Sequence, residues 1–225
     1  MEAILANGGT PACEEDVVRA LDWLKSQQNE DGSWGENLRV HLTGLAVLAY
    51  LGHCETHESA QYGETVTRAV AYLTERALAH EGYLKGDYVN HYHHNAYGCV
   101  EHAIGTYALG EAMAMFAKAD SPFPYARALK KAAREAVRFT LANQIQTGSF
   151  SWWSYGVENK SSRFDKSFRE NFWLYRYVIH TSWNLQSLVA AKEAGLHIPQ
   201  IQRRVPKGFE AMVVLQQRSP DLDGS

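Results

Sequence analysis

Apolar side chains recur along this chain at intervals of three and four residues, which is the periodicity of α-helices. The pattern predicts seven helices, over roughly residues 17–24, 42–51, 66–73, 99–117, 125–142, 175–194 and 202–217. An acidic turn, Glu14-Glu15-Asp16, suits the start of the first helix, and Pro206 is expected to break the last one early. Because no segment alternates apolar and polar residues over the length of a strand, the predicted fold class is all-α.

The seven predicted helices are of two alternating kinds. The first, third, fifth and seventh are amphipathic and charged on one side, whereas the second, fourth and sixth are rich in small residues and almost uncharged. A helix that is apolar on all sides is expected to be buried on all sides. The alternation therefore predicts an outer set of helices facing solvent and an inner set packed behind it.

The inner helices resemble one another in sequence. Residues 41–52 match residues 102–113, and residues 181–192 align with them more loosely. The aligned pairs are Gly44 with Gly105, His41 with His102, and Thr181 with Thr43. Small residues at these points let neighbouring helices approach closely. A repeat of this size predicts a stacked or closed array of helical hairpins, each burying its apolar side on the next.

The loops that follow the outer helices repeat as well. The related segments are residues 27–35, which read QQNEDGSWG, residues 141–152, residues 215–225 and, more weakly, residues 79–86. In the first copy, Gln27 is expected to bond the free carbonyls at the end of its helix, and Gly32 to adopt a positive φ. Trp34 is expected to pack on a neighbouring outer helix and to need a partner for its N–H. A turn and a cap explain these residues and Asp31, which favours a structural role over a catalytic one.

The loop pattern Gln-x-x-x-Asp-Gly-Ser-Trp, which Gln27–Trp34 fits, resembles the repeat signature of the squalene-hopene cyclase and prenyltransferase repeat superfamily. The chain looks most like bacterial members of that superfamily with no assigned activity. The resemblance implies an α/α-toroid, in which inner and outer helices alternate around a central cavity, as one domain over residues 1–225. Seven helices are fewer than a full ring needs, so we expect either a fragment of a longer chain or an incomplete ring. An incomplete ring would expose apolar helix faces and favour self-association.

The motifs that carry chemistry in related toroids are missing from this sequence. The cyclases protonate their substrate with an Asp-x-Asp-Asp motif, whereas here Asp221–Asp223 is followed by glycine. Protein prenyltransferases hold zinc with an Asp-x-Cys pair, but Tyr97 lies two residues before Cys99. Thioester proteins carry Gly-Cys-Gly-Glu-Gln, and Gly98–His102 reads GCVEH, without the glutamine. The motifs therefore support neither cyclisation, nor zinc-dependent prenyl transfer, nor a thioester.

The densest polar cluster of the sequence lies between Gly86 and His102. Its histidines could hold a transition metal, and the candidate ligands are His91, His93 and His94. Their spacing fits no common metal motif, and a polar loop with histidines at helix ends explains the cluster too. Glu101 and His102 are candidates for general acid–base catalysis. No cofactor is identified.

Three histidines, His41, His102 and His180, each lie near the start of a predicted inner helix. If the inner helices surround a cavity, these side chains could line one mouth of it together. His180 is therefore the third catalytic candidate. Hydrogen bonding between neighbouring repeats explains the three histidines equally well.

Aromatic residues are the candidates for binding an apolar substrate. Residues 150–177 form an aromatic-rich insertion, interleaved with arginines and lysines, that is too long for a simple helix connection. The insertion is interpreted as a lid, a docking surface for a partner, or a packed segment without a ligand. Aromatic faces on the inner helices could stabilise a carbocation in a cyclase-type enzyme. The substrate-binding candidates are Tyr107, Trp183, Trp152 and Trp153.

Composition narrows the partners and the compartment. The chain has 225 residues, a formal net charge of −3 and a pI of about 6.4, which give no reason to expect nucleic acid. Three cysteines far apart form no disulfide framework, and the N-terminus lacks the features of a signal peptide. These features favour a reducing, cytoplasmic location. The longest apolar run, residues 42–51, is too short to span a bilayer.

The missing acid and metal motifs favour a binding or interaction scaffold with an apolar-aromatic cavity. Its partner would be an apolar small molecule or a protein. The alternative is a terpenoid-cyclase-type enzyme acting on a polyprenyl or other apolar substrate, because one fold can support many functions. Whether the chain is an enzyme stays open at this point.

Overall fold

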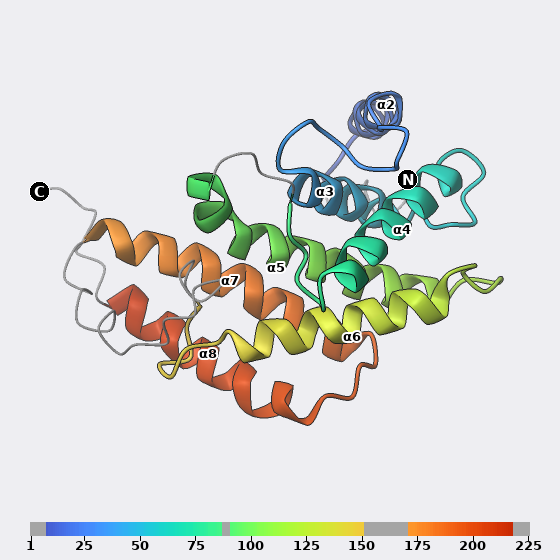
Figure 1. Ribbon diagram of the computed structural model, residues 1–225. Helices are drawn as coiled ribbons and strands as arrows, with labels where there is room; N and C mark the ends of the chain where they lie inside the picture. The colour runs from blue at the N-terminus through green and yellow to red at the C-terminus, as the bar shows by residue number, and fades with distance from the viewer. Residues whose placement is uncertain (1–7, 87–90, 151–170, 218–225) are drawn as a thin grey trace, which may run out of the picture.

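In a computed structural model, the chain is built of α-helices joined by loops (Figure 1). The structure describes residues 8–86, 91–150 and 171–217, without the side chains of residues 91–97, 171–177 and 215. The helices are α2 (Pro11–Ser26), α3 (Arg39–Gly52), α4 (Gly63–Ala79), α5 (His91–Phe116), α6 (Ala126–Ala142), α7 (Asn171–Glu193) and α8 (Pro199–Gln217). The described ranges contain no strand, so the predicted all-α class is confirmed. None of the described helices has both the length and the apolar character needed to cross a membrane.

Helix boundaries differ from the prediction at three places. α5 begins at His91 and α7 at Asn171, so the histidine-rich run and the end of the expected insertion are helical. α8 continues through Pro206 instead of breaking there. Proline lacks a backbone donor, which leaves the carbonyl one turn earlier without its usual partner. Gln202 and Pro206 are both exposed, so water can satisfy that carbonyl.

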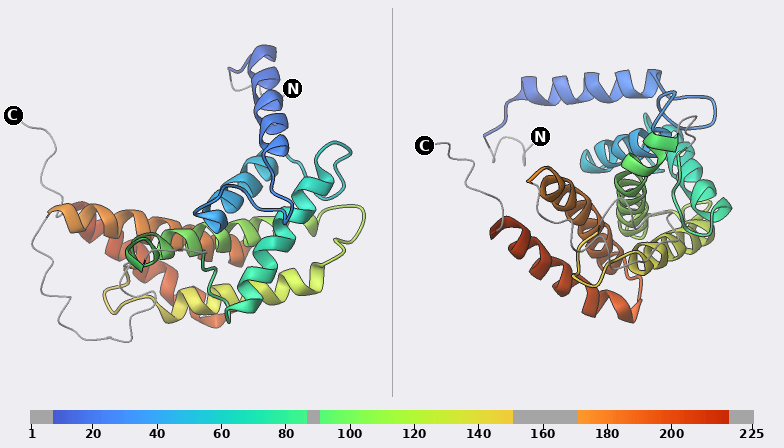
Figure 2. Two further views of the ribbon diagram at one scale, coloured as in Figure 1. Left: turned by 45° about the horizontal axis from the view of Figure 1, so that its top comes forward. Right: turned by 60° about the vertical axis from the view of Figure 1, so that its left-hand side comes forward.

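The helices form two layers (Figure 2). α3, α5 and α7 pack side by side in an inner layer. α4, α6 and α8 cover this layer from outside, each packed against the inner helix that precedes it, and α2 lies against α3. The two kinds of helix that the sequence distinguishes therefore correspond to the two layers.

Small residues set the spacing of the inner layer. A Cβ added to Gly44 of α3 would lie 2.8 Å from Cγ2 of Ile104 in α5, and Gly105 is next to that contact. A Cβ on Gly110 of α5 would lie 3.2 Å from Cβ of Ala190 in α7. Larger side chains here would push the helices apart, which costs packing energy.

Candidate functional site

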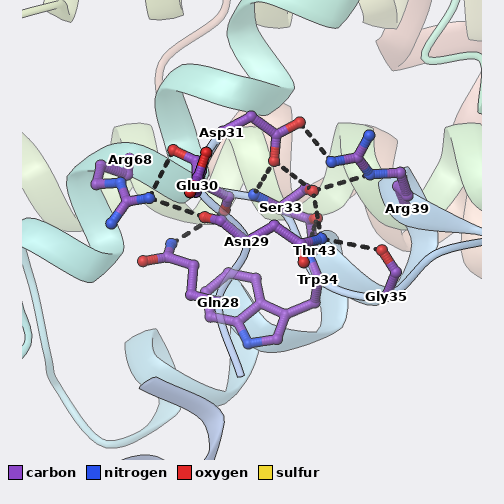
Figure 3. A network of polar contacts seen from close by, with 11 residues as sticks. Gln28, Asn29, Glu30, Asp31, Ser33, Trp34, Gly35, Arg39, Thr43 and Arg68 are labelled. Carbon is purple, nitrogen blue, oxygen red and sulfur yellow. Dashed lines mark hydrogen bonds and ion pairs between the residues drawn. The ribbon is translucent and has the colours of Figure 1, made fainter. Parts of the chain in front are cut away.

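The loop after each of α2, α4 and α6 is held in a similar way, and we call these loops clasps. The first, second and third clasps are Gln28–Trp34, Glu81–Leu84 and Gln144–Phe150. In the first clasp (Figure 3), Gly32 has φ +88°, as predicted, and a Cβ there would lie 2.5 Å from the carbonyl oxygen of Arg68. Gln28 Nε2 donates to the carbonyls of Gly32 and Thr65, both at 3.0 Å. The clasp is therefore fixed to its own turn and to the backbone of α4.

Gln28 is the glutamine that holds this clasp, and the prediction for Gln27 is wrong. The Gln27 side chain is exposed, and its Nε2 donates to the hydroxyl of Ser26 at 3.1 Å. The carbonyls at the end of α2 are reached by the backbone N–H of Gln27 instead, which donates to Trp23 and Leu24. A shift of one residue changes the direction of the side chain. The Gln28 side chain points toward α4, whereas the Gln27 side chain points to solvent.

Asp31 and two arginines tie the first clasp together (Figure 3). Asp31 Oδ1 accepts the backbone N–H of Ser33 at 3.1 Å and its hydroxyl at 2.7 Å, while Oδ2 pairs with Arg39 Nη2 at 2.5 Å. Arg68 Nη2 donates to the carbonyl of Asn29 at 2.8 Å. Partial burial alone would raise the pKa of Asp31, but the Ser33 hydrogen bonds and the Arg39 charge outweigh it and lower that pKa. Both carboxylate oxygens of Asp31 thus bond to groups that stabilise the loop, in line with the structural role predicted for this residue.

Trp34 connects the first clasp to both layers. Its backbone N–H donates to Thr43 Oγ1 of α3 at 3.1 Å. Its indole Nε1–H donates to the carbonyl of Leu24 in α2 at 2.7 Å, and the buried ring lies beside Tyr50. The predicted partner for the indole N–H exists, and it belongs to the helix that precedes the clasp.

The third clasp repeats the contacts of the first. Gln144 Nε2 donates to the carbonyls of Gly148 at 2.7 Å and Arg204 of α8 at 3.0 Å. Gly148 has φ +95°, and a Cβ there would lie 2.3 Å from the carbonyl oxygen of Lys207. Two loops more than a hundred residues apart in the sequence therefore dock on α4 and α8 by the same atoms.

The second clasp keeps the glycine and changes the polar side chains. Gly82 has φ +90°, and a Cβ there would lie 2.3 Å from the carbonyl oxygen of Glu135 in α6. Leu78 stands four residues before it, where the other clasps have glutamine. On the inner side, the backbone N–H of Leu84 donates to Nδ1 of His102 at 3.1 Å. His102 thus takes the role that threonine has in the first clasp.

These contacts correct the alignment of the repeats. In the third clasp, Phe150 donates its backbone N–H to Thr181 Oγ1 at 3.0 Å, so the predicted match of Thr181 with Thr43 is confirmed. The predicted match of His41 with His102 is wrong by two residues, because His102 stands in the place of Thr43. The similarity of the glycines misled the alignment. Gly44 and Gly105 do not occupy equivalent positions of the repeat. They lie next to each other where α3 packs on α5.

His102 is wholly buried between the second clasp and α6. Its Nε2 lies 2.9 Å from Thr140 Oγ1, whose hydroxyl donates in turn to the carbonyl of Ala136 at 3.1 Å. Because the Leu84 N–H points at Nδ1, the hydrogen bonds assign the neutral tautomer with its proton on Nε2. Burial lowers the pKa of His102 to about 3. These bonds account for the buried imidazole without a catalytic role, which stays a prediction.

Glu101 is also wholly buried, and it holds the beginning of α3. Its Oε1 accepts the backbone N–H of His41, the third residue of that helix, at 3.2 Å. The first turn of α3 contains no acidic residue and has no side-chain cap, so this carboxyl group from α5 supplies an acceptor for one of the free N–H groups there. Gly86 makes room for it, since a Cβ there would lie 2.6 Å from both carboxylate oxygens. As with His102, catalysis by Glu101 stays a prediction beside this structural role.

The three histidines expected at one mouth occupy three different positions. In each inner helix, one residue accepts the backbone N–H of the clasp. His41 lies two residues before that residue in α3, and His180 lies one residue before it in α7. In α5, His102 is itself that residue. His180 is buried, and Asn184 Nδ2 donates to its carbonyl at 2.8 Å. Side chains at different positions of a helical repeat point in different directions. The histidines therefore do not form one ring.

The side of the inner helices that points away from the outer layer is the best candidate for a binding surface. Between residues 98 and 112 of α5, every residue is buried except Val100, Tyr107 and Glu111, which share one side of the helix. The positions equivalent to Val100 and Tyr107 in the other inner helices are partly or fully exposed as well. We call this surface the inner face; it consists of His41, Leu48, Val100, Tyr107, Glu111, Ile179, Trp183 and Gln186.

The two predicted substrate-binding residues on the inner helices come together on this inner face. The rings of Tyr107 and Trp183 have centroids 6.4 Å apart at an interplanar angle of 48°. Gln186 Nε2 donates to Tyr107 Oη at 3.3 Å, which orients the phenol. Sequence reasoning missed Glu111, although it lies one helical turn after Tyr107 and so on the same side.

For the remaining predicted site residues, the structure describes no side chain. The side chains of His91, His93 and His94 are not described, although their backbone belongs to α5. Trp152 and Trp153 fall outside the described residues altogether. Among the residues that the structure describes, no group of three histidine, cysteine or acidic side chains is arranged to hold a metal ion.

Two cavities lie on the outer side rather than at the inner face: one of about 500 Å³ between the third clasp and α8, and one of about 460 Å³ between α6 and α8. Their walls include several cationic and amide side chains, among them Arg134, Arg138, Arg203, Arg204, Lys207, Gln144 and Gln200. Such walls suit water and anions better than an apolar substrate. The aromatic surface expected from the sequence is instead the inner face.

The sequence matches no model of a known protein family. Comparisons with curated proteins and with solved structures give no match either.

Proposed function

We propose that this chain is a helical repeat scaffold that binds an apolar small molecule, or an apolar segment of a protein partner, on its inner face without catalysing a reaction. The proposal includes the toroid-type arrangement that the sequence resemblance implies, in which the inner face would border a central cavity. The observation that carries it is the half-buried pair of Tyr107 and Trp183 between α5 and α7.

The chemistry of the inner face supports this proposal. Tyrosine and tryptophan offer large, rigid apolar areas with a polar group at one edge, which is why they are frequent at binding surfaces. Leu48, Val100 and Ile179 add partly exposed aliphatic side chains on the same side. An apolar ligand covering these residues would gain roughly 25 cal/mol per Å² of apolar surface removed from water.

The alternative, a terpenoid-cyclase-type enzyme, receives less support. A catalytic acid has to reach the atom it protonates. Glu101 and His102 are wholly buried and bonded to α3, the second clasp and α6. Beside the phenol of Tyr107, the inner face carries two ionisable groups, His41 and Glu111, and an enzymatic role would have to be tested there first.

The proposal is tested by titrating farnesol, an apolar prenyl alcohol, into the protein and following binding by calorimetry. We expect saturable binding that weakens about tenfold in Trp183→Leu and in Tyr107→Leu, since each loses roughly 1.4 kcal/mol of aromatic contact. Trp23→Leu is the matched control, because Trp23 is 62% exposed on α2 and outside the inner face. Equal weakening in Trp23→Leu, or no binding by the unaltered protein, would contradict the proposal.

A further inference from the structure

The clasp contacts put equivalent residues of the repeats in register. On the outer helices, the carbonyl beneath the clasp glycine belongs to Arg68 in α4, Glu135 in α6 and Lys207 in α8. On the inner helices, the residue that receives the clasp N–H is Thr43 in α3, His102 in α5 and Thr181 in α7. Burial can therefore be compared position by position along the three inner–outer pairs.

The last outer helix exposes positions that the earlier outer helices bury. The residues two and six positions after the reference carbonyl are Val70 and Thr74 in α4 and Val137 and Leu141 in α6, and all four are buried. In α8 the same positions hold Phe209 and Val213, which are 54% and 53% exposed. Apolar side chains of this size gain about 1.5–3 kcal/mol when they are buried, so their exposure is unfavourable unless a partner covers them.

The last inner helix shows the same contrast. One and eight positions after the reference residue stand Gly44 and Leu51 in α3 and Ala103 and Gly110 in α5, all of them buried. Gly44 and Gly110 mark the sides on which the next inner helix packs, since they contact α5 and α7 respectively. In α7 the same positions hold Ser182 and Val189, and both are exposed.

We propose that these four residues, Ser182, Val189, Phe209 and Val213, form a docking site for an α-helix of a partner protein. We call this surface the end face. The two earlier repeats define the occupant: an apolar helix of the inner type that places small residues against α7. The α7 part of the end face continues the interface that joins α3 to α5 and α5 to α7. Its α8 part continues the contacts that α4 makes with α5 and α6 makes with α7, in which each outer helix meets the next inner helix. This mode of recognition is a helix lying in an apolar groove.

A second copy of this chain is a poorer occupant. Suppose that α3 of a second copy packed on α7 at the end face. The α2 helix of that copy, which precedes its α3 and lies against it, would then need the outer position over α7 and the added α3. α8 already occupies that position, because it packs against α7 as α4 packs against α3. A free helix, or a hairpin that begins with an inner-type helix, meets no such obstacle.

The experiment uses the full chain and a synthetic peptide with the sequence of residues 178–193, which belongs to α7 and packs on α5 in this way. Fluorescence anisotropy of the labelled peptide measures its affinity, with a scrambled peptide as reference. We expect saturable binding of the peptide that weakens at least about tenfold in Phe209→Asp and in Val213→Asp, because each places a charge in an apolar contact.

Val214→Asp provides the matched control on the same helix. Val214 is 44% exposed, but its equivalents Glu75 and Ala142 are exposed too, so this position is not part of the repeating interface. We expect Val214→Asp to bind the peptide like the unaltered protein. Equal binding of the scrambled peptide, equal weakening in Val214→Asp, or no binding at all would overturn the proposal. Self-association abolished by Phe209→Asp in sedimentation would assign the end face to a second copy and also overturn it.

Discussion

The first and third clasps use glutamine and threonine where the second uses leucine and histidine. All three place a glycine at positive φ against a carbonyl of the next outer helix, at Arg68, Glu135 and Lys207. In the first and third, glutamine bonds two carbonyls and threonine receives the clasp from the inner layer. In the second, the position of the glutamine is apolar and His102 receives the clasp from the inner layer.

The difference shows which part of a clasp is essential and which is replaceable. The approach of backbone to backbone at the glycine recurs in all three described clasps, whereas the side chains that satisfy the loop vary. A buried histidine next to a buried glutamate can therefore have a purely structural explanation. His102 is best understood by comparison with Thr43 and Thr181, which occupy its position in the other repeats.

The largest effect is expected from removing His102. His102→Leu would leave the N–H of Leu84 buried without this acceptor, which costs about 1–3 kcal/mol. It would also remove the hydrogen bond to Thr140, whose hydroxyl keeps the carbonyl of Ala136 as a partner, at a cost of about 1 kcal/mol. We expect a loss of about 3–4 kcal/mol in the free energy of unfolding, measured with urea. His102→Asn keeps an acceptor near the Nδ1 position and should lose about half as much. A loss below about 1 kcal/mol in His102→Leu would contradict the structural role.

The clasp glycines should give the next largest effect. Gly148→Ala suffers both from its positive φ and from a Cβ 2.3 Å from the carbonyl oxygen of Lys207, and we expect a loss of about 3 kcal/mol. Gly195→Ala is the matched control, because Gly195 has φ +78° but nothing within 4 Å of its added Cβ. It should lose only about 1 kcal/mol, the cost of the backbone conformation alone. Equal losses in thermal unfolding would mean that the close approach does not matter.

Smaller losses of stability are expected from removing the glutamines that hold the first and third clasps. Gln28→Ala and Gln144→Ala each remove two hydrogen bonds from a clasp and should cost about 1–2 kcal/mol. Gln27→Ala should stay within about 0.5 kcal/mol, because that side chain is exposed. The three variants are compared by urea unfolding. If Gln27→Ala costs as much as Gln28→Ala, the clasp contacts are assigned to the wrong glutamine.

A smaller effect is expected at the N-terminal end, where α2 has an additional tether. His53 lies 2.9 Å from Glu14 of α2 and 3.0 Å from Glu55. The hydrogen bond with Glu14 raises the pKa of His53, against the opposing effect of burial, and Glu55 raises it further. Since the folded pKa lies above the unfolded one, this stabilisation is fully present below about pH 6.5 and is lost as the pH rises through the folded pKa.

His53→Gln removes that titration and provides the measurement. The difference in unfolding free energy between the unaltered protein and His53→Gln should be about 0.5–1 kcal/mol near pH 6 and should shrink at alkaline pH. Glu75→Gln, a change at an exposed site on α4, is the control and should show no such pH dependence. A difference that grows with pH would have the wrong sign for a raised pKa.

The sequence predicted the two layers but not the register of the repeats. Layering follows from composition, because the outer helices carry many charged residues and the inner helices carry few. The register depends on which side chain accepts the backbone N–H of each clasp. This residue is a threonine in α3 and a histidine in α5, and two such different residues do not reveal their equivalence in the sequence. Likewise, Tyr107 and Trp183 could be singled out as aromatic residues of inner helices. Glu111 lies on the same side of α5 as Tyr107, but only the packed structure shows that this side of an apolar helix stays open.

The protonation of His102 tests the central claim most directly, because it distinguishes a clasp residue from an accessible acid or base. Nitrogen NMR of the labelled histidines can follow this imidazole between about pH 8 and pH 5. With a pKa lowered to about 3 and both nitrogens bonded, His102 should keep its proton on Nε2 and stay neutral throughout. If His102 instead became half protonated near its ordinary pKa of about 6.5, it would be accessible to water, and the structural account of the second clasp would be wrong.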